Sequence, residues 1–227
     1  MFLSKRNDLI YPQSEHVALA TVIATHWGND RFEKPPVPRA SFIRAVANHD
    51  NGYGHYDTNV IGEQTEENLV RLWKRSTDQA LNDPFAEIII KRHFMRLAAF
   101  YTINATFPLV SKFHDELETT IQELYKKHNV TKHIFDVTDT VMNACEAISF
   151  SFCLGETVVR ELDVYPNATG DHKITITFSI HQNHTIVINP YPLDEAVITG
   201  TIRAYDKTDY PKILLPNEIN FQLMKQL

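Results

Sequence analysis

The spacing of apolar residues changes near Gly155, and this change limits the folds that the chain can adopt. Before that position apolar residues recur about every 3.6 residues, which is typical of helices that pack through one face. After it, residues 173–180 alternate apolar and polar side chains, as strands do, and residues 182–183 can form a turn. The sequence therefore predicts a mainly α protein, in which a helical bundle is followed by a small C-terminal antiparallel β-sheet packed on it.

The positions of the expected elements follow from these periods and from the glycines and prolines between them. The predicted helices are residues 14–27, 39–49, 66–81, 84–102, 109–128 and 134–154. The predicted strands are residues 173–180, 185–188 and 197–205, with 212–215 as a short fourth strand. No repeat, low-complexity tract or flexible linker interrupts the 227 residues. We therefore expect a helical core (1–155) and a β-rich extension (156–227) that fold as one unit.

Composition argues against several classes of partner. Asp and Glu (28) outnumber Lys and Arg (22), whereas nucleic acids and anionic membranes bind basic surfaces. No window of about eighteen residues is apolar enough to span a bilayer, and Lys5 and Arg6 interrupt any apolar N-terminal signal. We expect a cytoplasmic protein that acts on a small molecule, with Cys145 and Cys153 as buried free thiols.

The 11 histidines are numerous for this length, and three of them lie on helix faces that are otherwise apolar. His16 lies in the first turn of the first predicted helix, and His93 lies among isoleucines and leucines of a later one. His49 ends an apolar helix and is followed by Asp50, so an imidazole and a carboxylate could reach one cation. A single such histidine is more often a hydrogen-bonded core residue than a ligand, and that alternative stays open for each of them.

Glu146 is the strongest single indication of a site. From residue 140 to residue 155 it is the only ionisable side chain apart from the two thiols. An unpaired carboxylate in an apolar interior carries a large desolvation penalty or takes up a proton. Glu146 should therefore contact a cation, and either a basic side chain or a metal ion would satisfy it.

Together these residues predict a metal centre in the core of the bundle. The candidate ligands are His16, His49, Asp50, His93 and Glu146. Three imidazoles and two carboxylates favour Fe, Mn, Co or Ni in octahedral geometry over a tetrahedral structural zinc. We expect a divalent transition metal, with Fe or Mn preferred, as one or two ions. The reserve ligands for a second ion are His55, Asp57 and His114.

The order of these residues resembles the HD-domain superfamily of metal-dependent phosphohydrolases. More closely, the chain resembles a bacterial family known as domain of unknown function 3891, over nearly its whole length. The stretches that carry the resemblance are EHVALA (15–20), HWG (26–28), ANHDNGY (47–53), IKRHF (90–94), EAISFSFC (146–153) and NPYPLD (189–194).

The resemblance implies roles for individual residues. In HD domains a first His, a His-Asp pair and a late Asp bind a divalent metal that activates water against a phosphoester. These roles fall here on His16, His49, Asp50 and Glu146. His93 matches an additional histidine that many members use for a second metal.

Two positions depart from the superfamily pattern. Glu146 stands where the superfamily usually has Asp, which lengthens the ligand by one methylene. Tyr53 stands where many of the phosphohydrolases have a Lys that contacts substrate phosphate, and Lys91 or Arg92 could replace that cation.

Three functions are consistent with these residues. The leading hypothesis is a metal-dependent enzyme of HD-domain type, a hydrolase that acts on a small phosphorylated substrate. In it Asp50 would be both a ligand and a proton acceptor, with His55 or Asp57 as orienting or acid groups. The second is a di-iron oxygenase on the same ligands, acting on a small polyol or phosphonate. The third is a non-catalytic protein with a vestigial metal site.

Overall fold

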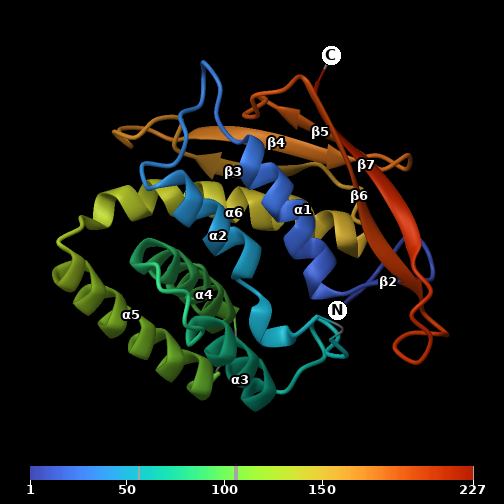
Figure 1. Ribbon diagram of the computed structural model, residues 1–227, viewed down its shortest axis with the longest axis horizontal. Coiled ribbons are helices and arrows are strands. Elements are labelled where there is room, and N and C mark those ends of the chain that lie inside the picture. The colour runs from blue at the N-terminus through green and yellow to red at the C-terminus, as the bar shows by residue number, and fades with distance from the viewer. Residues whose placement is uncertain (56, 105–106, 227) are drawn as a thin grey trace.

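The computed structural model describes residues 1–55, 57–104 and 107–226, and these contain six α-helices and a long curled sheet (Figure 1). The helices are α1 (Gln13–His26), α2 (Arg39–Asn48), α3 (Glu66–Thr77), α4 (Pro84–Asn104), α5 (Pro108–His128) and α6 (Lys132–Leu154). A short 3-10 helix, η1 (Asn51–Tyr53), follows α2. Each α-helix lies within a few residues of its predicted range, so the predicted helices are confirmed.

Local chemistry explains where several helices begin and end. The side chain of Thr65 caps α3, since its oxygen accepts a hydrogen bond from the backbone N–H of Asn68. α5 and α6 each end at a residue with a left-handed backbone, Asn129 (φ 50°) and Gly155 (φ 68°). These short-range signals are visible in the sequence, and they make the helix ends predictable.

The sheet shows that the predicted fold, with a small C-terminal antiparallel sheet on a helical bundle, was wrong. Across the described residues, seven strands pair in the order β1-β2-β6-β7-β5-β4-β3. The strands are β1 (Phe2–Leu3), β2 (Leu9–Tyr11), β3 (Arg160–Val164), β4 (Ile174–Ile180), β5 (Thr185–Asn189), β6 (Val197–Asp206) and β7 (Asn217–Lys225). β5 and β7 run parallel and the other neighbours run antiparallel, so this extensive sheet is mixed.

Long-range pairing accounts for the difference. β1 and β2 are only two and three residues long and precede the first helix, so they have no periodicity to read. β2 joins the sheet by pairing with β6, with Leu9 opposite Asp206. The predicted strand 212–215 lies in the loop before β7, which begins at Asn217 and inserts between β5 and β6. Alternation predicts that a segment is a strand but does not specify its neighbour.

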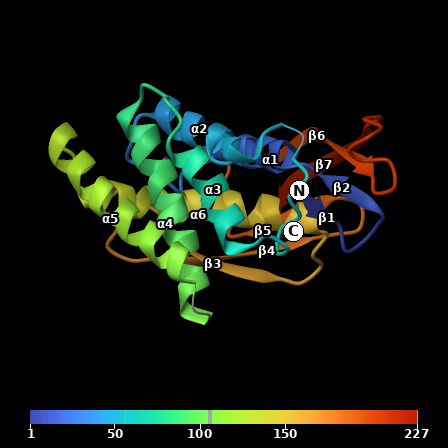
Figure 2. The same ribbon diagram turned by 90° about the horizontal axis from the view of Figure 1, so that it is seen from below.

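The sheet curls around α1 and α6, and the other helices pack on the opposite side of that pair (Figures 1 and 2). α2 packs on α1 and α4, while α4 also packs on α6 and carries α5 on its outer side. The first turn of α1, the end of α2 and the interior parts of α4 and α6 therefore meet in the core.

Cys145 and Cys153 are buried and free, as predicted. Burial raises the pKa of both thiols, so they stay protonated at neutral pH. Among the described helices, none combines the length and the apolar character needed to cross a bilayer.

Candidate metal centre

All five side chains predicted as metal ligands come together where four helices meet. His16 is in the first turn of α1, His49 and Asp50 directly follow α2, His93 is on α4 and Glu146 is on α6. The three imidazoles are fully buried, and Asp50 and Glu146 are 8% and 9% exposed. Residues as far as 130 positions apart in the sequence thus share one interior site.

Glu146 is the centre of the contacts in this cluster. Its Oε2 atom lies 2.9 Å from Nε2 of His16 and 3.0 Å from Nε2 of His49, which are hydrogen-bond distances. Oδ2 of Asp50 lies 4.0 Å and 3.8 Å from the same two nitrogens. In the described part of the chain, the ion-pair partners of Glu146 are these imidazoles rather than an arginine or a lysine.

The backbone of α2 orients the ring of His49. Its Nδ1–H donates to the carbonyl of Val46 at 2.7 Å, which directs Nε2 at Glu146 and Asp50. Histidines that bind metals are commonly fixed in this way, with the other ring nitrogen donating to a carbonyl or a carboxylate. His49 therefore has the orientation of a metal ligand through Nε2.

Burial and charge act in opposite directions on the acid–base groups of the cluster. Burial would lower the pKa of His49, but the carboxylates of Asp50 and Glu146 outweigh it and raise the pKa to about 9. Burial would raise the pKa of Glu146, but His16 and His49 hold it well below its usual range. Burial raises the pKa of Asp50. A proton on His49 thus provides the positive charge that the buried carboxylates require.

His93 contacts the same cluster from α4. Its ring lies edge-to-face against that of His49, with the centroids 5.0 Å apart. Burial lowers the pKa of His93 well below its usual range, so the ring is neutral. Arg96 donates from its guanidinium to Nδ1 of His93 at 3.2 Å. Nε2 of His93 is buried and has no hydrogen-bond partner among the described residues.

The donor atoms present suit a divalent transition metal. The potential ligand atoms form two sets, and within each set all atoms lie within 4.8 Å of one another. The first set is His16, His49 and Asp50, and the second is His49, His93 and Glu146. Imidazole nitrogens mixed with carboxylate oxygens, and no thiolate, are typical of Fe and Mn sites. A cation bound here would replace the protons that now join the imidazoles to Glu146.

A pocket of about 550 Å³ lies beside the cluster. Its walls come from α1, from the end of α2 and from the segment after it: Ser14, Val17, Ala18, Thr21, Ala47, Asp50, Asn51, Gly54 and His55. Asp50 is the residue of the cluster that lines this pocket, so a small molecule bound there would approach the centre at this carboxylate. Among the residues that the structure describes, none of those lining the pocket is a Lys or an Arg.

The two cations that could replace the phosphate-binding Lys make contacts elsewhere. Lys91 donates to the carbonyl of Thr77 at 2.8 Å. Arg92 donates to the hydroxyl of Tyr125 and to the carboxylate of Asp136, both at 2.7 Å. Both side chains join α4 to neighbouring helices, and neither is among the residues that line the pocket.

Comparison with known families gives this arrangement a context. The sequence matches the family described as protein of unknown function (DUF3891) over residues 3–206. The chain belongs to this family. No curated protein and no solved structure matched it.

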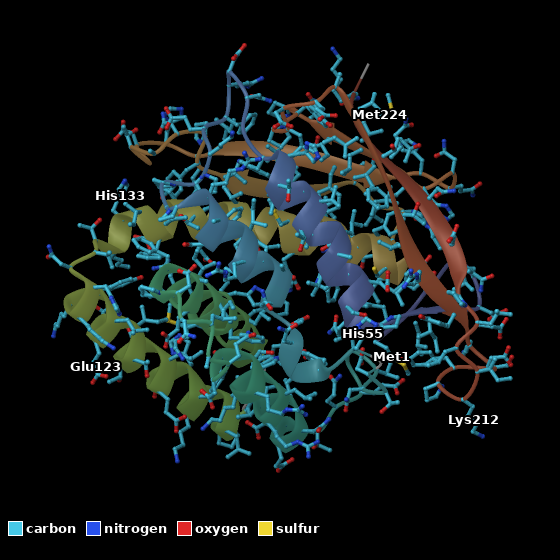
Figure 3. All side chains as sticks on the ribbon, viewed as in Figure 1. Met1, His55, Glu123, His133, Lys212 and Met224 are labelled. Atoms are coloured by element: carbon cyan, nitrogen blue, oxygen red, sulfur yellow. The ribbon has the colours of Figure 1, made fainter. Side chains whose placement is uncertain are left out.

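The structure of this DUF3891 member places the remaining candidates at three different positions. His55 lies beside the start of α1 (Figure 3). It is also one of the residues that line the pocket. Asp57 is buried, and its carboxylate accepts a hydrogen bond from the backbone N–H of Gln13 at 2.9 Å, which anchors the loop to α1. His114 is on α5 and forms a separate group with two exposed carboxylates of that helix.

Two residues near the DUF3891 centre make contacts that the sequence did not predict. Arg96 follows His93 by three residues on α4, and this spacing places both side chains on one helix face. The spacing was therefore a usable signal. Gly52, two residues after Asp50, packs against the backbone of α3 so closely that a side chain would not fit. That contact is tertiary, and local sequence gives no sign of it.

Proposed function

We propose that this DUF3891 protein is a metal-dependent enzyme of HD-domain type that hydrolyses a small phosphorylated substrate. The observation that carries the proposal is the convergence of His16, His49, Asp50 and Glu146 on one buried point beside a pocket. One or two Fe or Mn ions suit these donors. When bound, such an ion lowers the pKa of water towards neutrality and polarises a phosphoryl oxygen.

The positions of two pocket residues support this chemistry. Asp50 lines the pocket and lies close to Nε2 of both His16 and His49, so it can be a ligand and also accept a proton from water in the pocket. His55 lines the same pocket and could donate a proton to the leaving group. Asp57 would act indirectly, because its contact with Gln13 holds the loop that carries His55.

Metal analysis combined with a phosphatase assay tests the proposal. The purified protein should contain stoichiometric Fe or Mn and should cleave a generic aryl phosphate. His49→Ala and Asp50→Ala should each lose the metal and the activity while the far-UV circular dichroism stays that of the wild type. The matched control is His114→Ala, since His114 is also followed by an aspartate but lies on α5 outside the cluster. A His49→Ala variant with full metal content and normal turnover would refute the proposal.

The described residues that line the pocket include no Lys or Arg, which favours a second candidate, a di-iron oxygenase acting on a small polyol or phosphonate. Two irons per chain, a visible absorption band and substrate-dependent uptake of dioxygen would support it. Colourless protein that contains Mn and cleaves the aryl phosphate would support the hydrolase. Protein that takes up no metal after reconstitution would instead be a non-catalytic member with a vestigial site.

A further inference from the structure

The contact between Arg96 and His93 determines which nitrogen of His93 carries the proton. A guanidinium has only donors and stays protonated in proteins. Because Arg96 donates to Nδ1 at 3.2 Å, Nδ1 must be the unprotonated nitrogen of the ring. A hydrogen on Nδ1 would point at a second donor and a positive charge. The proton of the neutral ring therefore resides on Nε2.

The contact of Nδ1 with Arg96 leaves Nε2 as the nitrogen of His93 that is available to the centre. One ring nitrogen of His93 lies within 4.8 Å of ligand atoms of His49 and Glu146, and Nε2 is buried. No hydrogen-bond acceptor contacts this nitrogen in the described residues. A buried donor without an acceptor is costly, and native structures retain few of them. The geometry therefore points to an acceptor that is supplied by a molecule bound at the centre.

His93 differs in this respect from His49. His49 donates through Nδ1–H to the carbonyl of Val46, so its Nε2 has a lone pair for a cation once its second proton is lost. His93 has the reverse arrangement, since Nδ1 accepts and Nε2 donates. A metal ligand needs a lone pair on the nitrogen that faces the metal. The two buried histidines thus have different roles.

Arg96 is itself held in place. Its Nε lies 3.3 Å from Oδ2 of Asp139 on α6, and its side chain is about a quarter exposed. Arg96 therefore links α4 to α6 on the Nδ1 side of the His93 imidazole. Its positive charge polarises the ring and makes Nε2–H a better donor to a negatively charged oxygen.

We propose that His93 is not a metal ligand but a fixed Nε2–H donor, positioned by Arg96, for an anionic oxygen of the substrate. The proposal rests on the proposed metal-dependent function. It also gives the centre a hydrogen-bond donor for a negatively charged oxygen, whereas the described residues that line the adjacent pocket include no lysine or arginine. His93 is not itself among those lining residues, so the oxygen it receives must lie at the centre, past Asp50. Phosphoryl and carboxylate oxygens share the required chemistry.

The first experiment examines the tautomer in protein freed of metal by a chelator. Long-range ¹H–¹⁵N correlation spectra of ¹⁵N-labelled protein distinguish the two neutral forms of an imidazole, and the spectrum of His93→Gln assigns the signals. We expect His93 protonated at Nε2. Arg96→Gln, which offers an amide oxygen as acceptor, should shift the ring towards the Nδ1–H form. A wild-type ring protonated at Nδ1, or no change in Arg96→Gln, overturns the proposal.

The second experiment measures the metal and an anion separately. Co²⁺-reconstituted His93→Ala should keep one equivalent of metal with an affinity within about threefold of the wild type, whereas His49→Ala should lose at least about 100-fold. Inorganic phosphate, titrated by the visible Co²⁺ spectrum, should bind about tenfold more weakly to His93→Ala. His93→Gln, which keeps an N–H at a similar distance, should recover most of that affinity.

The outcomes separate the two proposals. Loss of Co²⁺ from His93→Ala to the same extent as from His49→Ala makes His93 a ligand and overturns the donor role. Equal phosphate affinity in the wild type and in His93→Ala also overturns it. Failure of the wild type itself to take up metal, with the Nε2–H tautomer intact, refutes the metal-dependent function while the tautomer assignment stands.

Discussion

Replacement of Gly52 by alanine should destabilise the protein and the site without altering any predicted ligand. Gly52 lies in η1, and its backbone N–H donates to Oγ of Ser76 at 3.0 Å. A Cβ placed on Gly52 would lie 2.6 Å from that oxygen and 2.7 Å from the backbone nitrogen of Ser76, with the carbonyl of Leu72 closer still. Backbone atoms cannot move aside as a flexible side chain would, so η1 must shift away from α3.

The expected cost of Gly52→Ala follows from these contacts. Overpacking of this kind costs about 1–3 kcal/mol. Loss of the hydrogen bond to Ser76 adds about 1 kcal/mol. We therefore expect about 3 kcal/mol, which for a chain of this size lowers Tm by about 6–12 °C. Because Asp50 is two residues away, the affinity for Co²⁺ should also fall by about tenfold.

Thermal and urea unfolding of metal-free protein, followed by far-UV circular dichroism, measures the effect. A chelator is required because a bound ion would add its own stabilisation. The matched control is Gly62→Ala, since Gly62 has φ +88° but no atom of the described residues lies within 4 Å of the added Cβ. Its cost should be limited to the strain of a left-handed backbone, about 1 kcal/mol. If Gly52→Ala is no less stable than Gly62→Ala, the close packing of η1 on α3 is not what holds this segment.

Three further outcomes are expected. Thr65→Ala removes the N-cap of α3 and should cost about 1 kcal/mol of unfolding free energy in urea, and unchanged stability would contradict the cap. Cys145 and Cys153 should not react with an aromatic disulfide reagent at pH 8 in the folded protein, because they are buried and burial raises the pKa of both thiols. Both should react once the protein is unfolded. Rapid labelling of the native protein would be inconsistent with that burial. In metal-free protein the raised pKa of His49 contributes stability that is fully present below about pH 6.5 and is lost as the pH rises through about 9. Urea titrations should show that decline in the free energy of unfolding. The decline should be shallower in Glu146→Gln, since this variant lacks one of the charges that raise the pKa of His49. An identical dependence of the unfolding free energy on pH in both proteins would exclude the contribution of Glu146.

Helices were predictable from the sequence because the signals that form them are local. The cap at Thr65 and the left-handed ends at Asn129 and Gly155 act within a few residues. The apolar faces of these helices also located the buried histidines correctly in the interior. Each of His16, His49 and His93 is fully buried.

The sheet was predictable only in part because pairing is not local. The hairpin of β4 and β5 follows from alternation around a turn, and both strands were predicted. β7, in contrast, lies parallel to β5 and antiparallel to β6, with Thr185 opposite Gln222 and Gly200 opposite Phe221. Such partners are chosen by the packing of the whole sheet on α1 and α6. No period within residues 217–225 specifies them.

In the site, too, local sequence predicted which residues are present but not the contacts of their individual atoms. From the sequence, His49 and His93 are the same kind of residue, each on an apolar helix, and both were predicted as ligands. The roles that we propose for them differ because of the group that contacts Nδ1, which is the carbonyl of Val46 for His49 and the guanidinium of Arg96 for His93. A carbonyl accepts a hydrogen bond from Nδ1–H, which leaves the lone pair of Nε2 available to a cation. A guanidinium instead donates to Nδ1, so the proton of the neutral ring is on Nε2. A cluster of histidines therefore predicts a metal centre, but only the contact made by the other ring nitrogen distinguishes a histidine that can bind a cation from one that can donate a hydrogen bond.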